Sequence, residues 1–369
     1  MPSIPHFRPN RRQFLQTSAA TLTGMALSSC GWTLANVRSQ PPAKSDPGKL
    51  HIYTWSNYAD ESLLQGFTAQ TGIQVTADVF DSNETMLAKM LAGGGGAYSV
   101  LSPSDYMVTK MVQQKLLVSL DSAQLVGLDS LFPRFQSPSY DRENAHSIPI
   151  SWGTTGLIYN ADKLKEAPQD WQYLWDHKDK LSKRLTLFND VREVMGATLR
   201  MLGYSYNSQN PAELKQAYEK LAELKPAIAS FTSDAWRNQI VTGDLWIAMS
   251  YSPDAVEMTK ESSQLQYVIP QSGTSVWTDT MVIPKSAPNP EGAYAWLNYI
   301  LQPSVGIEIS KRLNFATPNQ AVFDQLPAPL RNNLTLFPPE ALLAKCESIA
   351  PVDDVVEIYE RYWTQLTSS

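Results

Sequence analysis

Aromatic and acidic residues recur where predicted strands end, and together these residue types suit a cation that carries an apolar body. The clearest case is Trp277 with Asp279, in residues 276–284, VWTDTMVIP. Residues at i and i+2 of a strand share a face. An indole ring attracts positive charge, and a neighbouring carboxylate neutralises that charge and accepts its hydrogen bonds. The alternative interpretation is a turn-capping Asp beside an ordinary core Trp.

The same residue types follow other predicted strands. Asp190 and Glu193 lie i, i+3 in the first turn of a predicted helix and face the same way. Helix capping explains either acid alone equally well, and Asp254 after Pro253 has the same alternative. The recurrence at strand ends favours a ligand site. The candidate contacts are Trp55, Ser56, Tyr58, Ser104, Tyr106, Asp190, Glu193, Tyr251, Asp254, Trp277 and Asp279.

Other kinds of site lack the residues that they need. The four histidines form no ligand-spaced pair and there is no cysteine cluster, so neither a metal nor a cofactor is expected. No G-x-S-x-G motif occurs, and the candidate serines have no evident His and Asp partners, so no catalytic residues and no enzyme activity are predicted. The glycine run 93–96 lacks the Lys-Ser/Thr of a phosphate-binding loop and is interpreted as a flexible linker.

The elements that must position these residues alternate between strand and helix. This alternation predicts an α/β protein with mostly parallel sheets, in which ligands bind at the carboxyl ends of strands. The predicted strands are 49–55, 73–80, 98–101, 185–188 and 245–251, and the predicted helices are 60–70, 83–92 (with Asp81 and Glu84 at its start), 105–114, 191–202, 212–225, 235–241, 291–313 with a break near Pro303, and 354–366.

Three segments are predicted to cross between two lobes. Residues 147–159 should form two strands separated at 152–155, residues 276–284 should cross back, and residues 317–319 should cross a third time. Lobe 1 would comprise 49–152 and 278–319, and lobe 2 would comprise 153–277 and 320–369. Several crossings form a hinge, and a ligand cleft is expected between the lobes.

The first residues are typical of an export leader. Asn10-Arg-Arg-Gln-Phe-Leu15 is similar to a twin-arginine motif, and Leu27-Ser-Ser-Cys30 is similar to a lipobox. We therefore expect a signal peptide over 1–30, lipidation at Cys30, and a flexible tether over 31–48. The leader carries three Arg and no acids, so the net charge of −6 becomes more negative on its removal, which argues against nucleic acid as a partner. Cys346 then remains as a single thiol, expected to be buried.

Dispersed motifs resemble those of the polyamine-binding proteins of bacterial ABC transporters, the spermidine/putrescine-binding type. The resemblance covers nearly all of 49–369. It rests on Tyr53-Thr-Trp-Ser-Asn-Tyr58, Asp81-Ser-Asn-Glu-Thr-Met86, Pro103-Ser-Asp-Tyr106, Asp190-Val-Arg-Glu-Val194, Leu199-Arg-Met-Leu-Gly-Tyr204, Trp277-Thr-Asp-Thr280, Ile283-Pro284, Thr317-Pro-Asn319 and Ile358-Tyr-Glu360.

The resemblance implies a two-lobe periplasmic-binding-protein fold of type II that closes over a polyamine. It implies a periplasmic, lipid-anchored monomer that delivers its ligand to the membrane permease subunits of an ABC importer. By motif, the aromatic candidates Trp55, Tyr58, Tyr251 and Trp277 would contact the methylene chain. Ser56, Ser104 and Tyr106 would add polar contacts. The acids Asp190, Glu193 and Asp279 would pair with the nitrogens.

Three departures from the pattern leave the ligand length open. Tyr251 stands where spermidine-preferring members resemble one another in having Trp, and Asp254 is similar to an acid of putrescine-preferring members. A glutamine that contacts ligand in the spermidine type has no clear counterpart near residues 347–354. A receptor for another small cationic or amine-containing ligand is the alternative, and an exported hydrolase of the same shape is a weaker one because no nucleophile and base are evident.

Overall fold

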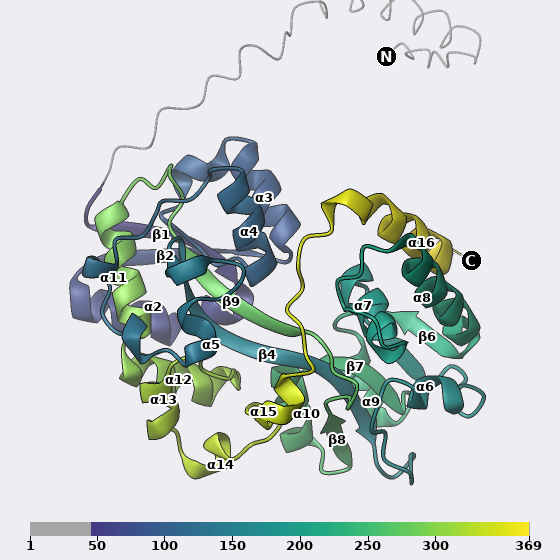
Figure 1. Cartoon of the computed structure of the whole chain (residues 1–369). Coiled ribbons are helices and arrows are strands. Elements are labelled where there is room, and N and C mark those ends of the chain that lie inside the picture. The colour runs from purple at the N-terminus through teal and green to yellow at the C-terminus, as the bar shows by residue number, and fades with distance from the viewer. Residues whose placement is uncertain (1–45, 369) are drawn as a thin grey trace, which may run out of the picture. The chain divides into compact units, whose positions relative to one another are not determined.

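The structure, a computed structural model, describes residues 46–368, which contain a nine-stranded mixed sheet (Figure 1). The strands pair in the order β2-β1-β3-β9-β4-β7-β5-β6, and β8 pairs with β4 off this path. They are β1 (Lys49–Trp55), β2 (Gln74–Phe80), β3 (Val100–Leu101), β4 (Ser147–Asn160), β5 (Leu185–Leu187), β6 (Ile228–Phe231), β7 (Ile247–Tyr251), β8 (Leu265–Val268) and β9 (Val276–Val282). The expected signal peptide, Cys30 and most of the tether lie outside the described residues.

Strand β4 links two halves of this sheet. Its first part, to Thr154, pairs antiparallel with β9, and its last part, from Thr155, pairs with β7 and β8. We call β1, β2, β3 and β9 the first half, and β5, β6, β7 and β8 the second half. β1, β2 and β3 pair in parallel, as do β5, β6 and β7, so the predicted parallel pairing is confirmed in each half. Figure 1 shows β4 and β9 running between the halves.

Helices surround both halves, and their ends follow ordinary capping chemistry. Asp60 caps α2 by accepting from Leu63 N at 2.9 Å, and Gly72 ends it in the left-handed region, as predicted. The helices are α2 (Glu61–Thr71), α3 (Asn83–Leu91), α4 (Asp105–Gln113), α5 (Pro133–Gln136), α6 (Tyr173–Asp176), α7 (Val191–Met201), α8 (Pro211–Leu224), α9 (Trp236–Thr242), α10 (Ser252–Glu261), α11 (Pro290–Leu301), α12 (Pro303–Leu313), α13 (Gln320–Gln325), α14 (Ala328–Arg331), α15 (Glu340–Leu343) and α16 (Val356–Ser368).

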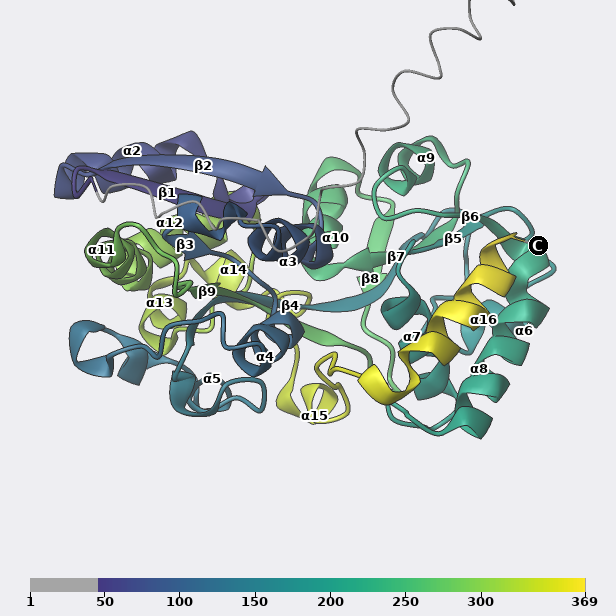
Figure 2. The ribbon, with the colours of Figure 1, turned by 90° about the horizontal axis from the view of Figure 1, so that it is seen from above.

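Each half buries its own apolar core. In the first half, Phe67 and Trp296 pack beneath β1, with α2 and α11 supplying them. In the second half, α7, α8 and α16 pack together (Figure 2) over a core that contains Leu199 and Leu221. A smaller cluster between them includes Trp152 of β4 and Val276 of β9. The two linking strands are therefore held by packing of their own.

The prediction of two strands over residues 147–159 is wrong, because β4 is one continuous strand of 14 residues. Every residue of β4 is buried, and the strand exchanges partners from β9 to β7 without a break at the polar residues 152–155. A second difference is β6, which the sequence did not predict. It has four residues, two of them exposed, so it carries little periodic signal.

Two local predictions around α3 also need correction. Ser82, not Asp81, caps the helix, and its hydroxyl accepts from Thr85 N at 3.1 Å. The glycine run is not a linker but forms a turn of 3-10 helix, Gly94–Ala97, packed against its surroundings. A Cβ added at Gly95 would lie 2.9 Å from Ser286 Oγ, so glycine is required there by close approach.

The crossing expected at residues 317–319 is not a strand. Asn319 instead caps α13, accepting from Val322 N at 3.2 Å. Helix α13 packs on α12, where a Cβ at Gly306 would lie 2.7 Å from Val322. The chain runs beside β9 later, where Val276 N donates to Glu347 O at 2.9 Å, and it then reaches α16 of the second half. The lobe boundaries stay a prediction.

Two further observations concern the described part alone. None of its helices is both long enough and apolar enough to cross a membrane. Cys346 is a free thiol, and it is only partly buried rather than fully buried as expected. Burial raises the pKa of this thiol, and its Sγ lies 3.4 Å from Leu342 O. These features give Cys346 the character of a structural residue.

Candidate functional site

Asp279 lies at the point where three elements of the first half meet. Tyr58, in the turn of 3-10 helix Ser56–Tyr58 after β1, donates from its hydroxyl to Asp279 Oδ2 at 3.1 Å. Ser104, which precedes α4, donates from its hydroxyl to Asp279 Oδ1 at 3.1 Å and bridges to the same residue through its backbone. Tyr58 also hydrogen-bonds Ser151 of β4. Three predicted site residues are thus in direct contact.

The charge of Asp279 is not balanced by a cation. The side chain is 9% exposed, and no salt bridge within residues 46–368 includes it. Burial raises the pKa of Asp279 to about 6, although the hydroxyls of Tyr58 and Ser104 favour the ionised form. A buried carboxylate held only by hydroxyl groups is ready to accept a positive charge.

A row of aromatic rings runs beside this carboxylate. Tyr58 stacks on Phe315 with centroids 5.3 Å apart, and Phe315 meets Trp277 edge-on at 6.2 Å. Trp277 in turn meets Tyr251 edge-on at 5.8 Å. Phe188 continues the row at 4.4 Å from Tyr251. Phe315 and Phe188 were not among the predicted contacts, although Phe188 lies two residues before Asp190 in sequence.

Gly153 of β4 makes room for Trp277. A Cβ built at Gly153 would lie 2.3 Å from Trp277 Cζ2 and 2.8 Å from Ser252 Oγ. The indole therefore lies close against the linking strand at Gly153. Its Nε1 is buried without a hydrogen-bond partner, as is that of Trp55. Trp55 itself packs against Phe80 with ring centroids 4.5 Å apart, and Ser56 is exposed and makes no side-chain hydrogen bond within residues 46–368.

Glu193 is the acid at the centre of the second half. It is 2% exposed and accepts hydrogen bonds from Thr155 (3.0 Å), Ser275 (2.8 Å) and Tyr206 (2.7 Å). Burial, followed by the charge of Asp190, raises the pKa of Glu193 to about 7. Like Asp279, it is held by hydroxyls and belongs to no salt bridge of the described chain.

Asp190 caps α7, as the alternative interpretation had it. Its Oδ1 accepts from Arg192 N at 2.8 Å and Glu193 N at 3.1 Å. Burial raises its pKa all the same, so capping does not compensate the charge. The Arg192 side chain turns away, donating to Ala350 O and Asn207 Oδ1, each at 2.8 Å. Capping and a place in the acidic site are therefore compatible.

Tyr106 brings the first half close to these acids. Its hydroxyl donates to Glu84 Oε1 at 3.0 Å and accepts from Asn83 at 3.1 Å. Burial first, then Glu84 and also the charge of Asp190, raise the pKa of Tyr106, so Asp190 lies within electrostatic reach of it. Glu84 was recognised as part of a motif but not as a site residue. The sequence does not show that Glu84 on α3 contacts Tyr106 on α4, because the two residues are brought together only by the fold.

Asp105 is a second acid that the sequence prediction did not include. It is 1% exposed, and its Oδ1 accepts from Tyr106 N at 2.8 Å while Oδ2 has no partner. Burial raises the pKa of Asp105 to about 8, so this carboxyl is largely protonated at neutral pH. Asp105 lies between Ser104 and Tyr106, two predicted contacts, and this position in the sequence could have indicated that it belongs to the site.

Asp254 differs from the other predicted acids. Its Oδ1 lies 3.0 Å from Arg237 Nη2, and its side chain is 21% exposed. Burial raises the pKa of the neighbouring Tyr251. The negative charges of Glu193, Asp190 and Asp254 raise it further. Asp254 thus lies by the aromatic row, but a cation of the chain itself already faces it.

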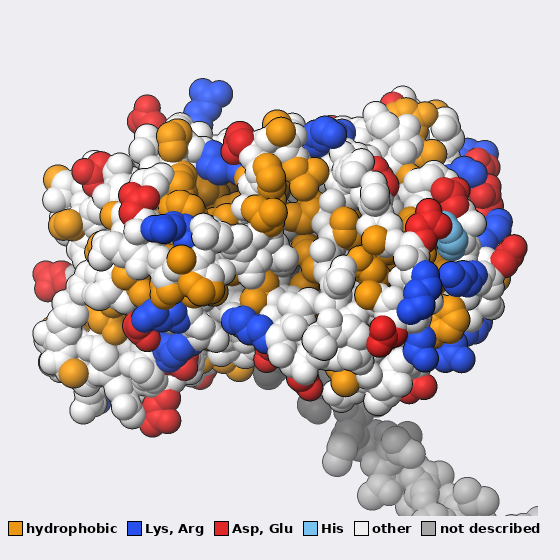
Figure 3. Space-filling model, turned by 90° about the horizontal axis from the view of Figure 1, so that it is seen from below, with side chains coloured by type: hydrophobic (Ala, Val, Ile, Leu, Met, Phe, Trp, Pro, Cys, Tyr) orange, Lys and Arg blue, Asp and Glu red, His pale blue; other side chains and the backbone are white. Residues whose placement is uncertain are grey.

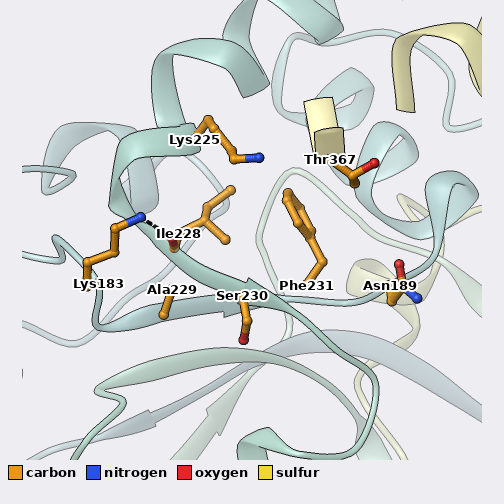
Figure 4. A pocket seen from close by; sticks show the side chains of 8 residues that line it. All are labelled: Lys183, Asn189, Lys225, Ile228, Ala229, Ser230, Phe231 and Thr367. Carbon is orange, nitrogen blue, oxygen red and sulfur yellow. Dashed lines mark hydrogen bonds between the residues drawn. The ribbon is translucent and has the colours of Figure 1, made fainter. Parts of the chain in front are cut away.

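Two cavities lie apart from these residues. One of about 370 Å³ borders β6 and the end of α16, where Lys183 Nζ donates to Ile228 O at 2.9 Å (Figure 4). The other, of about 440 Å³, has walls of Phe132, Phe135, Phe323, Phe337 and Leu343, and apolar side chains gather on that side (Figure 3). Neither includes a predicted contact. No cluster of three or more metal-binding side chains occurs in residues 46–368.

Comparison with known proteins matches the chain to solute-binding proteins, by family profile and by individual sequence. The profile of the family "bacterial extracellular solute-binding protein" matches residues 62–336. The spermidine/putrescine-binding periplasmic protein of Salmonella typhimurium is 34% identical over 87% of this chain and 92% of its own. The putrescine-binding periplasmic protein SpuD of Pseudomonas aeruginosa is 31% identical over 91% of this chain and 96% of its own.

A solved structure agrees with these sequences. The spermidine/putrescine ABC transporter substrate-binding protein PotD of Streptococcus pneumoniae superimposes with a TM-score of 0.80. It is 35% identical, and the match covers 87% of this chain and 98% of that one. The expected α/β solute-binding fold is therefore confirmed, and the family is not one of enzymes. The chain belongs to the bacterial extracellular solute-binding protein family.

Proposed function

We propose that this protein captures polyamines, putrescine or spermidine or both, outside the cytoplasm and delivers them to an ABC importer. One observation carries the proposal. Asp279 and Glu193 are buried and Asp190 is partly buried near a continuous row of aromatic rings, and no salt bridge of the described residues neutralises any of the three. A ligand that supplies several positive charges on an apolar chain complements such a site.

The chemistry of a polyamine fits each part of the site. An ammonium group offers three donors and no acceptor, so it pairs best with carboxylates and is repelled by other cations. Methylene groups laid along aromatic faces leave water, which contributes about 0.8 kcal/mol for each group. The distance between the acids then selects ligands by their length.

Individual roles follow from this fit. In the proposed complex, Trp55, Tyr58, Tyr251 and Trp277 enclose the methylene chain. Asp279 holds one nitrogen, and Asp190 with Glu193 holds another. Ser56, Ser104 and Tyr106 supply polar contacts. The names of the relatives from Salmonella, Pseudomonas and Streptococcus support a polyamine as the ligand.

A receptor for a different small cationic or amine-containing ligand is the second candidate. Asp254 supports this second candidate. It was expected to bind an ammonium group of the ligand, but its carboxylate already lies 3.0 Å from Arg237. A compact monoamine with an apolar body would need fewer acids than a polyamine. It would still use Asp279 and the aromatic row.

Transport requires partners beyond the ligand. We propose that two lobes, 49–152 with 278–319 and 153–277 with 320–369, close on the ligand about β4 and β9. A closed monomer would then dock on the permease subunits of the importer. Lipidation of Cys30 would hold the protein at the membrane surface through the segment 31–48.

Cys30→Ala tests this anchor. We expect the variant to be released from the membrane fraction.

Calorimetric titration of residues 31–369 tests the ligand. The panel comprises putrescine, cadaverine, spermidine, spermine, n-butylamine as a monoamine, and 1,4-butanediol as a neutral analogue of putrescine. Binding of the polyamines with no heat from butanediol is the expected result. Binding of the monoamine alone would favour the second candidate. No binding of any polyamine at millimolar concentration would exclude the proposed function.

A further inference from the structure

The acids around the aromatic row differ in one respect that bears on ligand choice. Asp279 and Glu193 accept hydrogen bonds from hydroxyls, and Asp190 accepts them from backbone N–H groups. Asp254 is the one predicted acid whose carboxylate faces a cation in a salt bridge of the described chain, at 3.0 Å from Arg237. Arg237 therefore balances part of the charge that Asp254 could offer to a ligand.

Arg237 is held in place from several sides. It belongs to α9, and its Nη1 donates to Asp234 Oδ1 at 2.7 Å. Its guanidinium carbon lies 5.5 Å from the ring centre of Trp236, which is itself fully buried. The planar fork of arginine can serve both carboxylates at once, one through each terminal nitrogen. Arg237 therefore does not depend on a ligand for its position.

Asp254 is fixed just as firmly beside the aromatic row. It lies in the first turn of α10, three residues after Tyr251. Ser252, between them, accepts from Thr154 N at 3.2 Å and so ties the start of α10 to the linking strand β4. Tyr251 and Trp277 are neighbours in the row. An ammonium at this end of the site would have to share Asp254 with Arg237 or displace it.

We infer that Arg237 is a specificity-determining residue, an internal counter-cation that occupies Asp254 and so withholds one acidic anchor from the ligand. The inference rests on the proposed function. With Arg237 present, the site neutralises nitrogens at Asp279 and at Asp190 with Glu193. Without it, Asp254 becomes a further anchor, and a triamine gains more from that anchor than a diamine does.

The test is a double-mutant cycle of Arg237→Gln and Asp254→Asn, measured by calorimetry with spermidine and putrescine. Removing one charge of this partly buried pair leaves the other uncompensated, so we expect R237Q to bind spermidine about tenfold more tightly and D254N about tenfold more weakly. The double variant should return close to the wild type. The gain of R237Q should be smaller for putrescine.

Two further variants separate charge from folding. Arg237→Lys keeps the positive charge but not the planar fork, so it should bind spermidine more weakly than R237Q does. Arg134→Gln removes an arginine with a similar degree of exposure, whose partner Glu340 borders the cavity that includes no predicted contact, and should leave binding unchanged. Thermal unfolding of each variant shows whether it is folded.

The outcomes separate a failure of the proposed role of Arg237 from a failure of the proposed function. Unchanged binding in a folded R237Q, with D254N weakened, would mean that Asp254 anchors the ligand directly and that Arg237 does not compete. Unchanged binding in both would place the pair outside the site. Either result overturns the inference but leaves the polyamine receptor standing. A wild-type protein that binds neither ligand would overturn both.

Discussion

At the scale of single residues, the acids are maintained in an unfavourable state. A carboxylate removed from water loses hydration that hydroxyl donors restore only in part. Asp279 is 9% exposed and Glu193 is 2% exposed, and burial raises the pKa of both. A fold selected for stability alone would neutralise or replace such groups. Their presence together fits a site that is completed by its ligand.

Asp279→Asn should weaken polyamine binding by about 2–5 kcal/mol, because the bound ammonium would lose its counter-charge inside the protein. Asparagine keeps the size of the side chain and can still accept from Ser104. Calorimetry with the tightest-binding polyamine measures the change. Asp78→Asn is the matched control, since Asp78 also accepts from a tyrosine hydroxyl (Tyr98, 2.5 Å) but lies on β2. Unchanged affinity in a folded Asp279→Asn protein would reduce Asp279 to a structural residue.

Binding should also strengthen as the pH rises from 5 to 8. Asp279 and Glu193 have pKa values raised to about 6 and about 7, so both hold protons in the lower part of this range. An ammonium favours their ionised forms, and binding at low pH must therefore release protons. Each group weakens binding by up to about tenfold for every pH unit below its pKa.

Titrations in buffers with different ionisation enthalpies would measure this proton release directly. Asp279→Asn should remove the part of the pH dependence that is centred near 6. An affinity that does not vary between pH 5 and 8 would contradict the assignment of these two acids to the ligand site.

At the scale of elements, β4 positions the aromatic row through the close contact of Gly153 with Trp277. Gly153→Ala should displace the Trp277 ring, because the new Cβ would lie 2.3 Å from it, and should lower polyamine affinity about tenfold or more. Gly156→Ala is the comparison on the same strand, since its Cβ would meet Val268 O of β8 at 2.4 Å. It should lower stability and leave the affinity of the folded protein nearly unchanged. Equal affinities in both variants would show that Trp277 is not part of the site.

The sequence predicted most elements of this fold because their ends carry clear signals. The caps at Asp60 and Asp190 and the Pro303 break between α11 and α12 lie where they were expected. The continuity of β4 was not predictable from local pattern, since its polar residues 152–155 suggest a turn. They are buried because β9 and β7 pair with them in succession, a long-range effect.

The candidate site was predictable to a similar extent. Residues next to strand ends, such as Tyr58, Ser104 and Asp279, are in contact as expected. Phe315 and Arg237 come from other parts of the chain and reach the row only through tertiary packing. Whether a given acid has a partner is a property of the fold. The sequence could therefore list the acids but could not separate Asp254 from Asp279.

At the scale of the whole molecule, the acids come from both halves of the sheet. Asp279 and Glu84 belong to elements of the first half, and Asp190 and Glu193 to α7 of the second. Burial raises the pKa of Asp190, Arg192 opposes this, and the charge of Glu84 adds to it, so the carboxylates of Glu84 and Asp190 repel one another across the two halves. A cation between them would turn this repulsion into attraction. Ligand binding would thus favour closure of the two halves.

Stability should depend on ligand and pH together. Unfolded Asp and Glu titrate near pH 4, whereas burial raises the pKa of folded Asp279, Glu193 and Asp190. Between these values the folded protein binds more protons than the unfolded chain. The free energy of unfolding without ligand should therefore fall as the pH rises from 4 to 8.

A saturating polyamine should cancel this trend, because it pairs with the ionised acids and leaves no difference in bound protons between the folded and unfolded forms. At 100 times its dissociation constant it should raise the free energy of unfolding by about 2.7 kcal/mol. At one fixed ligand concentration the increase should be larger at pH 8 than at pH 5, since binding is tighter there. Urea denaturation with and without spermidine at both pH values measures the four free energies. The same increase at both pH values would mean that the ligand does not bind through these acids.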